Sequence, residues 1–387
     1  MSMMNVVKPR VPYDSKTRKK FLDLPFSVAE YQQRIDNTRR LMEEQDLAGL
    51  VAFGDQNDLG HLIYLANFEP MMGRGAVVVT SDSATLVTDS AFHGEPMHSL
   101  VWRTWIDQVR IAGWSFQSFV LEVQSALDGV KGKVGAVGLY TFPVRELGVN
   151  VVDVDRLFLE MKSRKTGNEL EVMREASRIT SCGMRAAVEA TKVGVPETEV
   201  VAEACRAMFE EGANRLTFQP IVVGGPRTGT KHDYPSKRRI EEGDMVYIDL
   251  GAISNGYLSD MSRTVLMGKG DVRQRNALNS ILEIYTDLID RIRPGIRAGD
   301  IARFGEELAE SKGWRQDFWA TGHGLGTGFS EIPMFSPTSG DIFEPGMVFA
   351  YEPMIVRLGL GTAVVEDTVA VTDTGITTLT EHERKLW

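Results

Sequence analysis

The sequence predicts a mixed α/β (α+β) protein with two domains, residues 1–157 and 158–387. Its 387 residues suit two domains at roughly 100–200 residues each. With 43% hydrophobic and 25% charged residues, the composition is typical of a globular protein able to bury a sizeable core. Short β-branched runs alternate with helical stretches, which is the pattern of mixed α/β domains.

The first domain is predicted to open with a helix over residues 24–46. Ser27 is a suitable N-cap, and Glu30 follows three residues later in the capping-box position. Short β-branched runs then predict strands, separated by turn residues, at 47–55, 75–80, 84–89 and 133–140. We expect this domain to end near residues 153–161.

The second domain is predicted to begin with two helices. Residues 167–193 carry apolar residues at helical spacing and are stopped by Gly194 and Pro196, and residues 197–214 form a second helix that Gly212 ends. Further helices are predicted at 272–293 and 297–312. Strands, hairpins and Gly-rich loops are expected over 217–269 and 318–380.

The overall charge argues against several kinds of partner. Lys and Arg total 43 and Asp and Glu total 53, so the formal net charge is −10, the wrong sign for binding nucleic acid or an anionic membrane. No apolar run reaches the ~18 residues of a membrane span. Two cysteines are too few for a disulfide framework, so a reducing cytoplasm is the expected compartment.

Two aspartates interrupt strand-like runs in the second domain. Asp249 and Asp260 lie almost symmetrically about the hairpin signal Ser254-Asn255-Gly256. This symmetry predicts that they are cross-strand neighbours. Because facing like charges destabilise a hairpin unless something positive lies between them, a divalent cation is the economical explanation.

Three further residues extend this set. Glu352 and Glu366 each interrupt an apolar strand, and His323 lies in a Gly-rich loop where the backbone can approach a ligand closely. Two Asp, two Glu and one His suit two hard or borderline ions, of which we expect Mn²⁺ first, with Fe²⁺, Co²⁺ or Zn²⁺ as alternatives. Such a pair would polarise a substrate oxygen and lower the pKa of a bound water.

The order of these five residues resembles a known family. Asp260 stands eleven residues after Asp249, and the stretches GDMVYIDLGA, GYLSDMSRT, GHGLG, EPGMVFAYEP and VVEDTVAVT over about residues 161–380 look like the "pita-bread" prolidases, Xaa-Pro and methionine aminopeptidases and creatinase. The resemblance implies a C-terminal pita-bread domain, a smaller N-terminal creatinase/prolidase-like domain and a homodimer. It also implies a dinuclear centre held by Asp249, Asp260, His323, Glu352 and Glu366.

The same resemblance suggests two catalytic residues. His232, 17 residues before Asp249, is similar to the family's substrate-facing histidine, a role suited to a group that titrates near neutral pH. Glu352 would both ligate metal and accept the proton of the attacking water. The expected reaction is hydrolysis of a C–N bond in a small polar substrate, nearest to that of an Xaa-Pro dipeptidase or aminopeptidase.

The sequence also departs from the peptidases at three places. Ser330 stands where they have a second histidine seven residues after the ligand, Trp319 where they usually have another histidine, and Val364 where they usually have an arginine. Two alternatives therefore stay open, namely a relative acting on a non-peptide metabolite, as creatinase, ectoine hydrolase and dimethylsulfoniopropionate lyase do, and a catalytically silent binding protein. Candidate substrate-binding residues are Ser330, Glu331, Trp319, Arg357 and, from a neighbouring subunit, His93.

Overall fold

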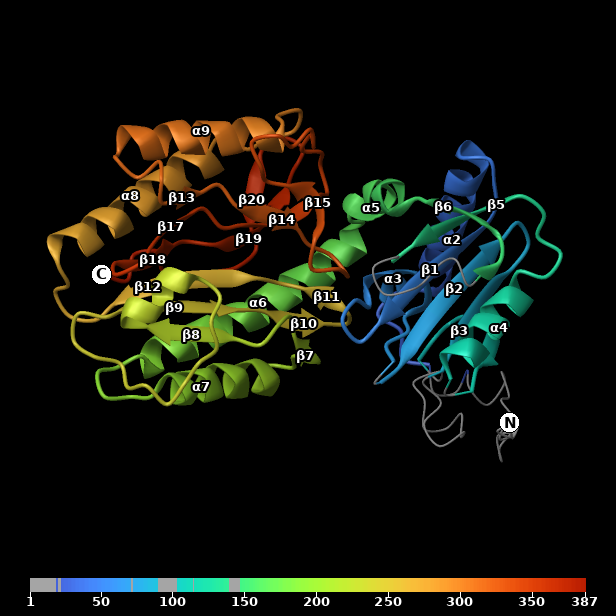
Figure 1. The fold of residues 1–387 in the computed structure, drawn as a ribbon, viewed down its shortest axis with the longest axis horizontal. Helices are drawn as coiled ribbons and strands as arrows, with labels where there is room; N and C mark the ends of the chain where they lie inside the picture. The colour runs from blue at the N-terminus through green and yellow to red at the C-terminus, as the bar shows by residue number, and fades with distance from the viewer. Residues whose placement is uncertain (1–18, 20–21, 71, 90–102, 114, 139–146) are drawn as a thin grey trace. The chain divides into compact units, whose positions relative to one another are not determined.

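The computed structural model describes residues 19, 22–70, 72–89, 103–113, 115–138 and 147–387 (Figure 1). The chain divides into two compact units, Met1–Lys162 and Ser163–Trp387. The expected domain boundary after residue 157 falls within the helix Asp155–Ser163, next to this division.

The first unit is built around a mixed sheet. Its described strands lie in the order β4-β3-β2-β1-β5-β6, with β1–β2 and β2–β3 antiparallel and the other pairs parallel. The elements are α2 (Val28–Glu44), β1 (Leu47–Asp55), α3 (Gly60–Ala66), β2 (Arg74–Thr80), β3 (Ala84–Thr88), β4 (Gln108–Ile111), α4 (Phe116–Ala126), β5 (Lys133–Val137), β6 (Asn150–Asp153) and α5 (Asp155–Ser163).

The predicted opening of this unit is confirmed. Ser27 caps α2 by accepting a hydrogen bond from the backbone of Glu30, and β1 covers the predicted strand. The strand β1 is buried along most of its length because both faces of the sheet are covered by apolar clusters.

The second unit places strands between two pairs of helices. In Figure 1, α8 and α9 lie along one side of its strands and α7 along the other, with α6 packed on α7 and on the hairpin strands. Its elements are α6 (Gly167–Ala190), α7 (Glu197–Glu210), β7 (Arg215–Leu216), β8 (Ile221–Gly224), the 3₁₀ helix η6 (Gly225–Thr230), β9 (Met245–Leu250), β10 (Ala252–Ser254), β11 (Tyr257–Leu258), β12 (Met261–Leu266), α8 (Val272–Ile289), α9 (Ala298–Ser311), β13 (Phe318–Trp319), β14 (Gly322–Gly324), β15 (Glu331–Met334), β16 (Val348–Tyr351), β17 (Met354–Arg357), β18 (Gly361–Val364), β19 (Asp367–Val371) and β20 (Ile376–Thr378). All four predicted helices are present; α6, α7 and α8 end three or four residues earlier than predicted, and α9 is one residue shorter at each end.

The hairpin that carries the two aspartates has a different register from the one predicted. Asn255 (φ 49°) and Gly256 (φ 82°) form the turn, and Ser254 pairs with Tyr257, so Ser254 belongs to the ladder and not to the turn. Asp249 consequently pairs with Ser262, and the prediction that it directly opposes Asp260 was wrong by two residues. Because side chains alternate along a strand, a two-residue offset keeps both aspartates on one face.

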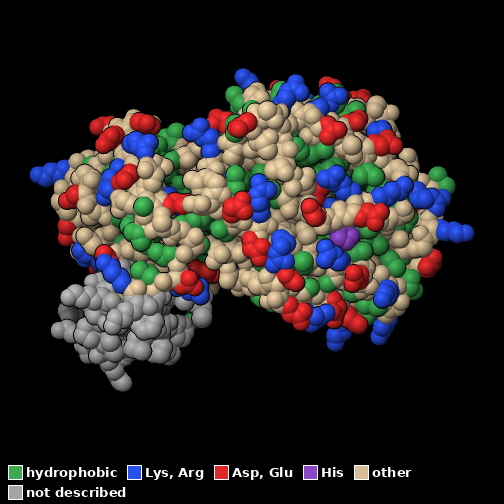
Figure 2. All heavy atoms as spheres, turned by 180° about the vertical axis from the view of Figure 1, so that it is seen from behind, with side chains coloured by type: hydrophobic (Ala, Val, Ile, Leu, Met, Phe, Trp, Pro, Cys, Tyr) green, Lys and Arg blue, Asp and Glu red, His purple; other side chains and the backbone are tan. Residues whose placement is uncertain are grey.

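One face of the described residues is mixed in charge. On the face shown in Figure 2, acidic and basic side chains are interspersed, and neither sign forms a broad patch. No helix within the described ranges has both the length and the apolar character needed to cross a bilayer.

Candidate metal centre and substrate pocket

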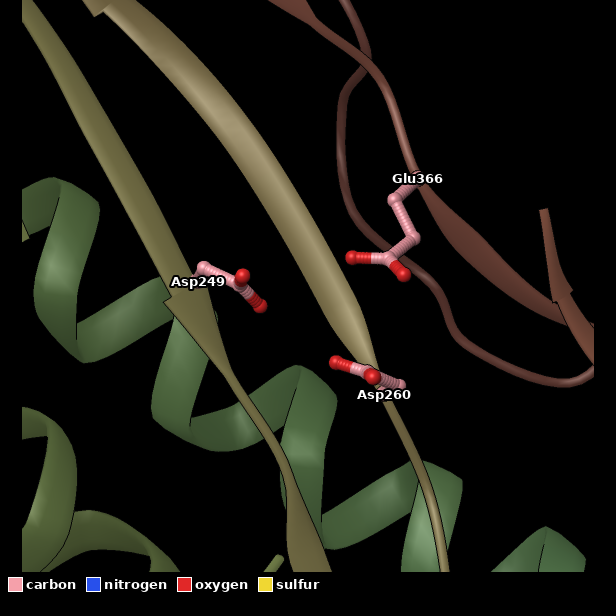
Figure 3. Close-up of side chains that lie close together, drawn as sticks. All are labelled: Asp249, Asp260 and Glu366. Atoms are coloured by element: carbon pink, nitrogen blue, oxygen red, sulfur yellow. The ribbon is translucent and has the colours of Figure 1, made fainter. Parts of the chain in front are cut away.

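Three buried carboxylates face one another at the centre of the second unit. Asp249 lies on β9, Asp260 directly before β12, and Glu366 between β18 and β19, and Figure 3 shows their side chains directed toward a common space. One oxygen from each lies within 4.8 Å of the others. One hairpin, which carries Asp249 and Asp260, and a distant segment, which carries Glu366, therefore bring three carboxyl groups together.

The hydrogen bonding of these carboxylates is incomplete. Among the described residues, Asp249 Oδ1, Asp260 Oδ1 and Glu366 Oε2 are buried without a partner. Buried acceptors without a hydrogen-bond partner are costly unless a bound ion or water satisfies them. Carboxylate oxygens are the preferred ligands of hard divalent cations, so the residues present fit a divalent metal ion.

Burial also makes these acids hard to ionise without a cation. It raises the pKa of Asp249 to about 6 and that of Glu352 to about 7. The pKa values of Asp260 and Glu366 lie well above their ordinary values, first because of burial and then because of the neighbouring carboxylates. A bound cation would remove the repulsion that holds protons on the cluster.

His323 is placed to add a nitrogen donor. Its Nε2 lies 3.8 Å from Asp260 Oδ2, and its Nδ1 lies 3.3 Å from the carbonyl oxygen of Gly324. Because a carbonyl only accepts, Nδ1 is the donor in this contact, and with the proton there Nε2 would be the nitrogen that binds a metal. Burial lowers the pKa of His323, which favours the neutral imidazole that a metal requires.

One cavity of about 540 Å³ contains the whole predicted set. Glu352 lies between β16 and β17, where its backbone pairs with Thr321, and it lines this cavity with the three carboxylates and His323. His232 lines it as well. The structure thus brings together all five predicted ligands and the predicted catalytic histidine, with Glu352 outside the tight group of three.

A second layer of polar groups holds the carboxylates in place. Tyr247, also on β9 and two residues before Asp249, donates its hydroxyl to Asp249 Oδ2 at 2.5 Å. Arg263 is fully buried, donates to the backbone oxygen of Glu366, and pairs with Asp367 Oδ1 at 2.8 Å. These contacts fix Asp249 and Glu366 independently of any ligand.

The other predicted substrate residues lie outside the lining of the cavity. Glu331 is buried and pairs with Lys165 Nζ at 2.9 Å, while the backbone of Gly328 donates to its other oxygen. The Ser330 hydroxyl points to the sulfur of Met334, and Arg357 pairs with Asp317. Their substrate roles, and that of the exposed Trp319, stay predictions, and His93 lies outside the described residues.

The loop that carries His232 is held by a buried acid. Glu197, at the start of α7 and fully buried, accepts hydrogen bonds from the backbones of Gly224 and Ser236, from the Ser236 hydroxyl, and from Arg227 at 2.9 Å. Arg227 in turn contacts Asp233 Oδ2 and the backbone oxygen of Tyr234. The segment that holds His232 is thereby hydrogen-bonded to α7 at both ends, at Gly224 and at Ser236.

We expect Glu197→Gln to loosen this loop. The amide keeps the shape but loses the charge that pairs with Arg227, so the unfolding free energy should fall by about 2 kcal/mol and kcat/KM by about tenfold. Denaturant unfolding and steady-state kinetics test this. The matched control is Glu203→Gln, a half-buried acid of the same helix whose carboxylate pairs with Arg206, which should change neither quantity. Unchanged values for both variants would contradict the role assigned to Glu197.

Several residues of the pocket had no role in the predictions. Phe218 and Phe329 line the cavity with ring centroids 5.6 Å apart, and Phe329 also lies 4.6 Å from His323. Tyr234, which is 74% exposed, completes the aromatic lining. Single aromatic residues in loops belong to no periodic pattern, so the sequence does not predict their place in the pocket. Tyr247 lies two residues before Asp249 on one strand, and strand alternation could have predicted that both side chains lie on the same face.

A buried acid cluster beside an imidazole, in a cavity of this size, is the site of a metal-dependent hydrolase. The sequence matches metallopeptidase family M24 over residues 171–373, more than half of its length and including every residue of the cluster. The chain belongs to this family, which implies divalent metal ions, and it is a metal-dependent hydrolase.

The similarity of this chain to individual proteins covers both of its units. The chain is 28% identical over 355 residues to the Xaa-Pro dipeptidase of Pyrococcus furiosus, covering 89% of this chain and 99% of that one. It resembles the crystal structure of the prolidase from Pyrococcus horikoshii with a TM-score of 0.80 at 25% identity, covering 92% of this chain and all of the other. The prolidase structure from Pyrococcus furiosus matches with a TM-score of 0.78 at 27% identity, over 89% of this chain and 99% of that one. The mixed α/β fold predicted from the sequence is confirmed.

Proposed function

We propose that the protein is a dinuclear, manganese-dependent peptidase that cleaves Xaa-Pro dipeptides, acting as a homodimer in the cytoplasm. The observation that carries the proposal is the convergence of Asp249, Asp260 and Glu366, each with an unpartnered buried oxygen, beside His323 and Glu352. The names of the relatives support a dipeptide substrate, since the Pyrococcus furiosus protein is an Xaa-Pro dipeptidase. The scarcity of cysteine supports the compartment.

The five residues would share two cations. Bound there, divalent ions supply positive charge that polarises a scissile carbonyl and lowers the pKa of a water molecule. Glu352 lines the cavity beside the three carboxylates and His323, where its carboxylate could take the proton of the attacking water and return it. His232 is exposed to the cavity, and its pKa is lowered by partial burial and by the charge of Lys231, so its neutral imidazole can hold the substrate amide by hydrogen bonding.

Three departures from the peptidase sequences favour a second candidate function. Ser330, Trp319 and Val364 stand where the resembling peptidases have two histidines and an arginine. Val364 is fully buried and packs with Tyr247 and Met354, so it offers no polar group to a peptide. A relative that hydrolyses the C–N bond of a small non-peptide metabolite would keep the residues that hold the metal. It would lack the two histidines and the arginine that the peptidases carry.

Metal analysis and a substrate panel test the proposal together. Protein loaded with Mn²⁺, Fe²⁺, Co²⁺ or Zn²⁺ and freed of excess ion should contain two metals per chain by elemental analysis, and the Mn²⁺ form should cleave Ala-Pro and Gly-Pro but not Ala-Ala. Less than one bound metal under every condition would reject the dinuclear site. Turnover of betaines, guanidino compounds or cyclic amino acids, with no dipeptide cleaved, would replace the peptidase by the second candidate.

A further inference from the structure

The segment of residues 379–387 is hydrogen-bonded to several elements of the second unit. The amide of Glu381 donates to Ser181 Oγ on α6 at 2.8 Å. The amide of Leu266 on β12 donates to the carbonyl oxygen of Leu386 at 3.1 Å, and the end of the chain, marked C in Figure 1, lies beside this strand. Because the segment forms no helix and no named strand, these contacts with other elements define its path.

The 379–387 segment binds the buried side chain of Asp367, the first residue of β19. Thr380 Oγ1 donates to Asp367 Oδ1 at 3.0 Å, and Arg384 Nε donates to Asp367 Oδ2 at 3.0 Å. Two other buried residues, Arg263 and Tyr285, donate to the same two oxygens at 2.8 and 2.7 Å. Each oxygen of this carboxylate therefore accepts from two donors, which fixes the side chain of Asp367 in one position.

The same segment completes the hydrogen bonding of Arg263. Its Nε donates to the carbonyl oxygen of Glu383 at 3.0 Å, and its Nη2 donates to that of His382 at 3.2 Å. Its other N–H groups bond to nearby oxygens, among them the backbone oxygen of Glu366. A guanidinium has five N–H donors, and all five are used in a side chain that is fully buried. Through this one side chain the segment is connected to the backbone of Glu366.

Thr368, the second residue of β19, connects the segment to Asp260. Its amide donates to Thr380 Oγ1 at 3.2 Å, and its carbonyl oxygen accepts from the amide of Leu379 at 2.8 Å. Its hydroxyl donates to the carbonyl oxygen of Asp260 at 2.8 Å and accepts from the amide of Asp260 at 2.9 Å. One buried hydroxyl thus holds both backbone polar groups of Asp260, and the segment holds the residue that carries this hydroxyl.

We propose that residues 379–387 are a positioning segment of the metal centre: by binding Asp367 and Thr368, chiefly through Arg384, they keep Asp260 and Glu366 in the geometry that binds metal ions. The proposal rests on the metal centre of the proposed function and not on its dipeptide substrate. Ligands that are held in place in advance lose little conformational freedom when an ion binds, so such positioning raises the affinity for metal. Among the described residues that line the cavity, none belongs to this segment.

Arg384 and its neighbour Lys385 provide a matched pair of substitutions. Arg384→Met and Lys385→Met each remove one positive charge from the segment, but Lys385 is exposed and Arg384 donates to Asp367. We expect Arg384→Met to raise the Kd for Mn²⁺, measured by calorimetric titration of chelator-treated protein, by about tenfold, because groups that orient metal ligands contribute about 10- to 100-fold in affinity. Lys385→Met should bind Mn²⁺ as wild type does. Arg384→Lys, whose ammonium can still donate to Asp367, should return the Kd to within about threefold of wild type.

The alternative is that the segment only stabilises the fold. In that case Arg384→Met would lower the melting temperature of the metal-free protein and leave the Kd for Mn²⁺ unchanged, and this result would overturn the proposal. An equal rise in Kd for Arg384→Met and Lys385→Met would overturn it as well, because charge alone would then explain the change. If Arg384→Met does not fold, Thr380→Val, which removes one donor to Asp367, should still raise the Kd by about threefold, and an unchanged Kd would count against the proposal.

Amide hydrogen exchange separates this proposal from the proposed function. If the wild-type protein binds less than one Mn²⁺ per chain, the dinuclear centre fails, but exchange in the metal-free protein still tests whether the segment holds the residues around Asp260 and Glu366. We then expect the amides of Asp260 and Thr368 to exchange at least about tenfold faster in Arg384→Met than in wild type, with those of α7 unchanged. Equal exchange of these two amides in both proteins would overturn the positioning role of the 379–387 segment.

Discussion

Asp260→Asn should lower kcat by at least about three orders of magnitude, equivalent to ~4 kcal/mol of transition-state stabilisation. Asp260 lies between the other groups, since its carboxylate is close to those of Asp249 and Glu366 and 3.8 Å from His323 Nε2. The amide keeps the shape of the side chain and removes one negative charge and one oxygen donor. We therefore expect bound metal, measured by elemental analysis, to fall well below two ions per chain.

The same substitution should have the opposite effect on the metal-free fold. Burial, and after it the neighbouring carboxylates, hold the pKa of Asp260 well above its ordinary value. Removing its charge relieves both costs, so metal-free Asp260→Asn should unfold at a higher temperature than metal-free wild type at pH 8. Asp287→Asn, an exposed acid of α8, is the control. A variant that loses activity and is also less stable without metal would indicate a structural acid instead of a metal ligand.

The sequence predicted most of the site because its residues break a pattern. Charged residues in buried strands are conspicuous, so Asp249, Glu352 and Glu366 could be found from the apolar runs around them. The exact pairing of Asp249 could not be found in this way. The turn signal Ser254-Asn255-Gly256 is compatible with two registers, and only the ladder shows that Ser254 pairs with Tyr257.

The contacts that sequence reasoning could not find are those made with a partner distant in the chain. Glu331 stands one residue after the position where the resembling peptidases carry a histidine, but its carboxylate pairs with Lys165, 166 residues away in the chain. Arg227 is committed to Glu197 across 30 residues. Lys231 and Trp319 meet only because β13 and the end of η6 are neighbours in the fold. No local periodicity records such contacts.

The stability of the metal-free protein should fall as the pH rises from about 6.5 to 8. Asp249 and Glu352 have pKa values of about 6 and about 7 in the folded metal-free protein, above the ordinary values of 3.8 and 4.5. Over this range the folded chain binds more protons than the unfolded chain, so ionisation costs folding free energy. A shift of two pKa units corresponds to about 3 kcal/mol for each group, most of it lost between about pH 4 and 7, so the fall above pH 6.5 is the last part of this change and comes mainly from Glu352. The lowered pKa values of His232 and His323 act with the opposite sign, but below pH 6.5, where unfolded histidine titrates.

Metal ions should reverse this pH dependence because they bind the ionised carboxylates. The increase in melting temperature on adding Mn²⁺ to chelator-treated protein should be larger at pH 8 than at pH 6.5, and calorimetry in buffers of different ionisation enthalpy should detect protons released at pH 6.5 but few at pH 8. In Asp260→Asn, the pH dependence of the metal-induced increase in melting temperature and the proton release at pH 6.5 should both be smaller. A metal-free melting temperature that rises between pH 6.5 and 8, with equal proton release at both, would show that the cluster is ionised before metal binds. Its charges would then have to be balanced by protein groups, and the orphaned oxygens of Asp249, Asp260 and Glu366 would need another explanation.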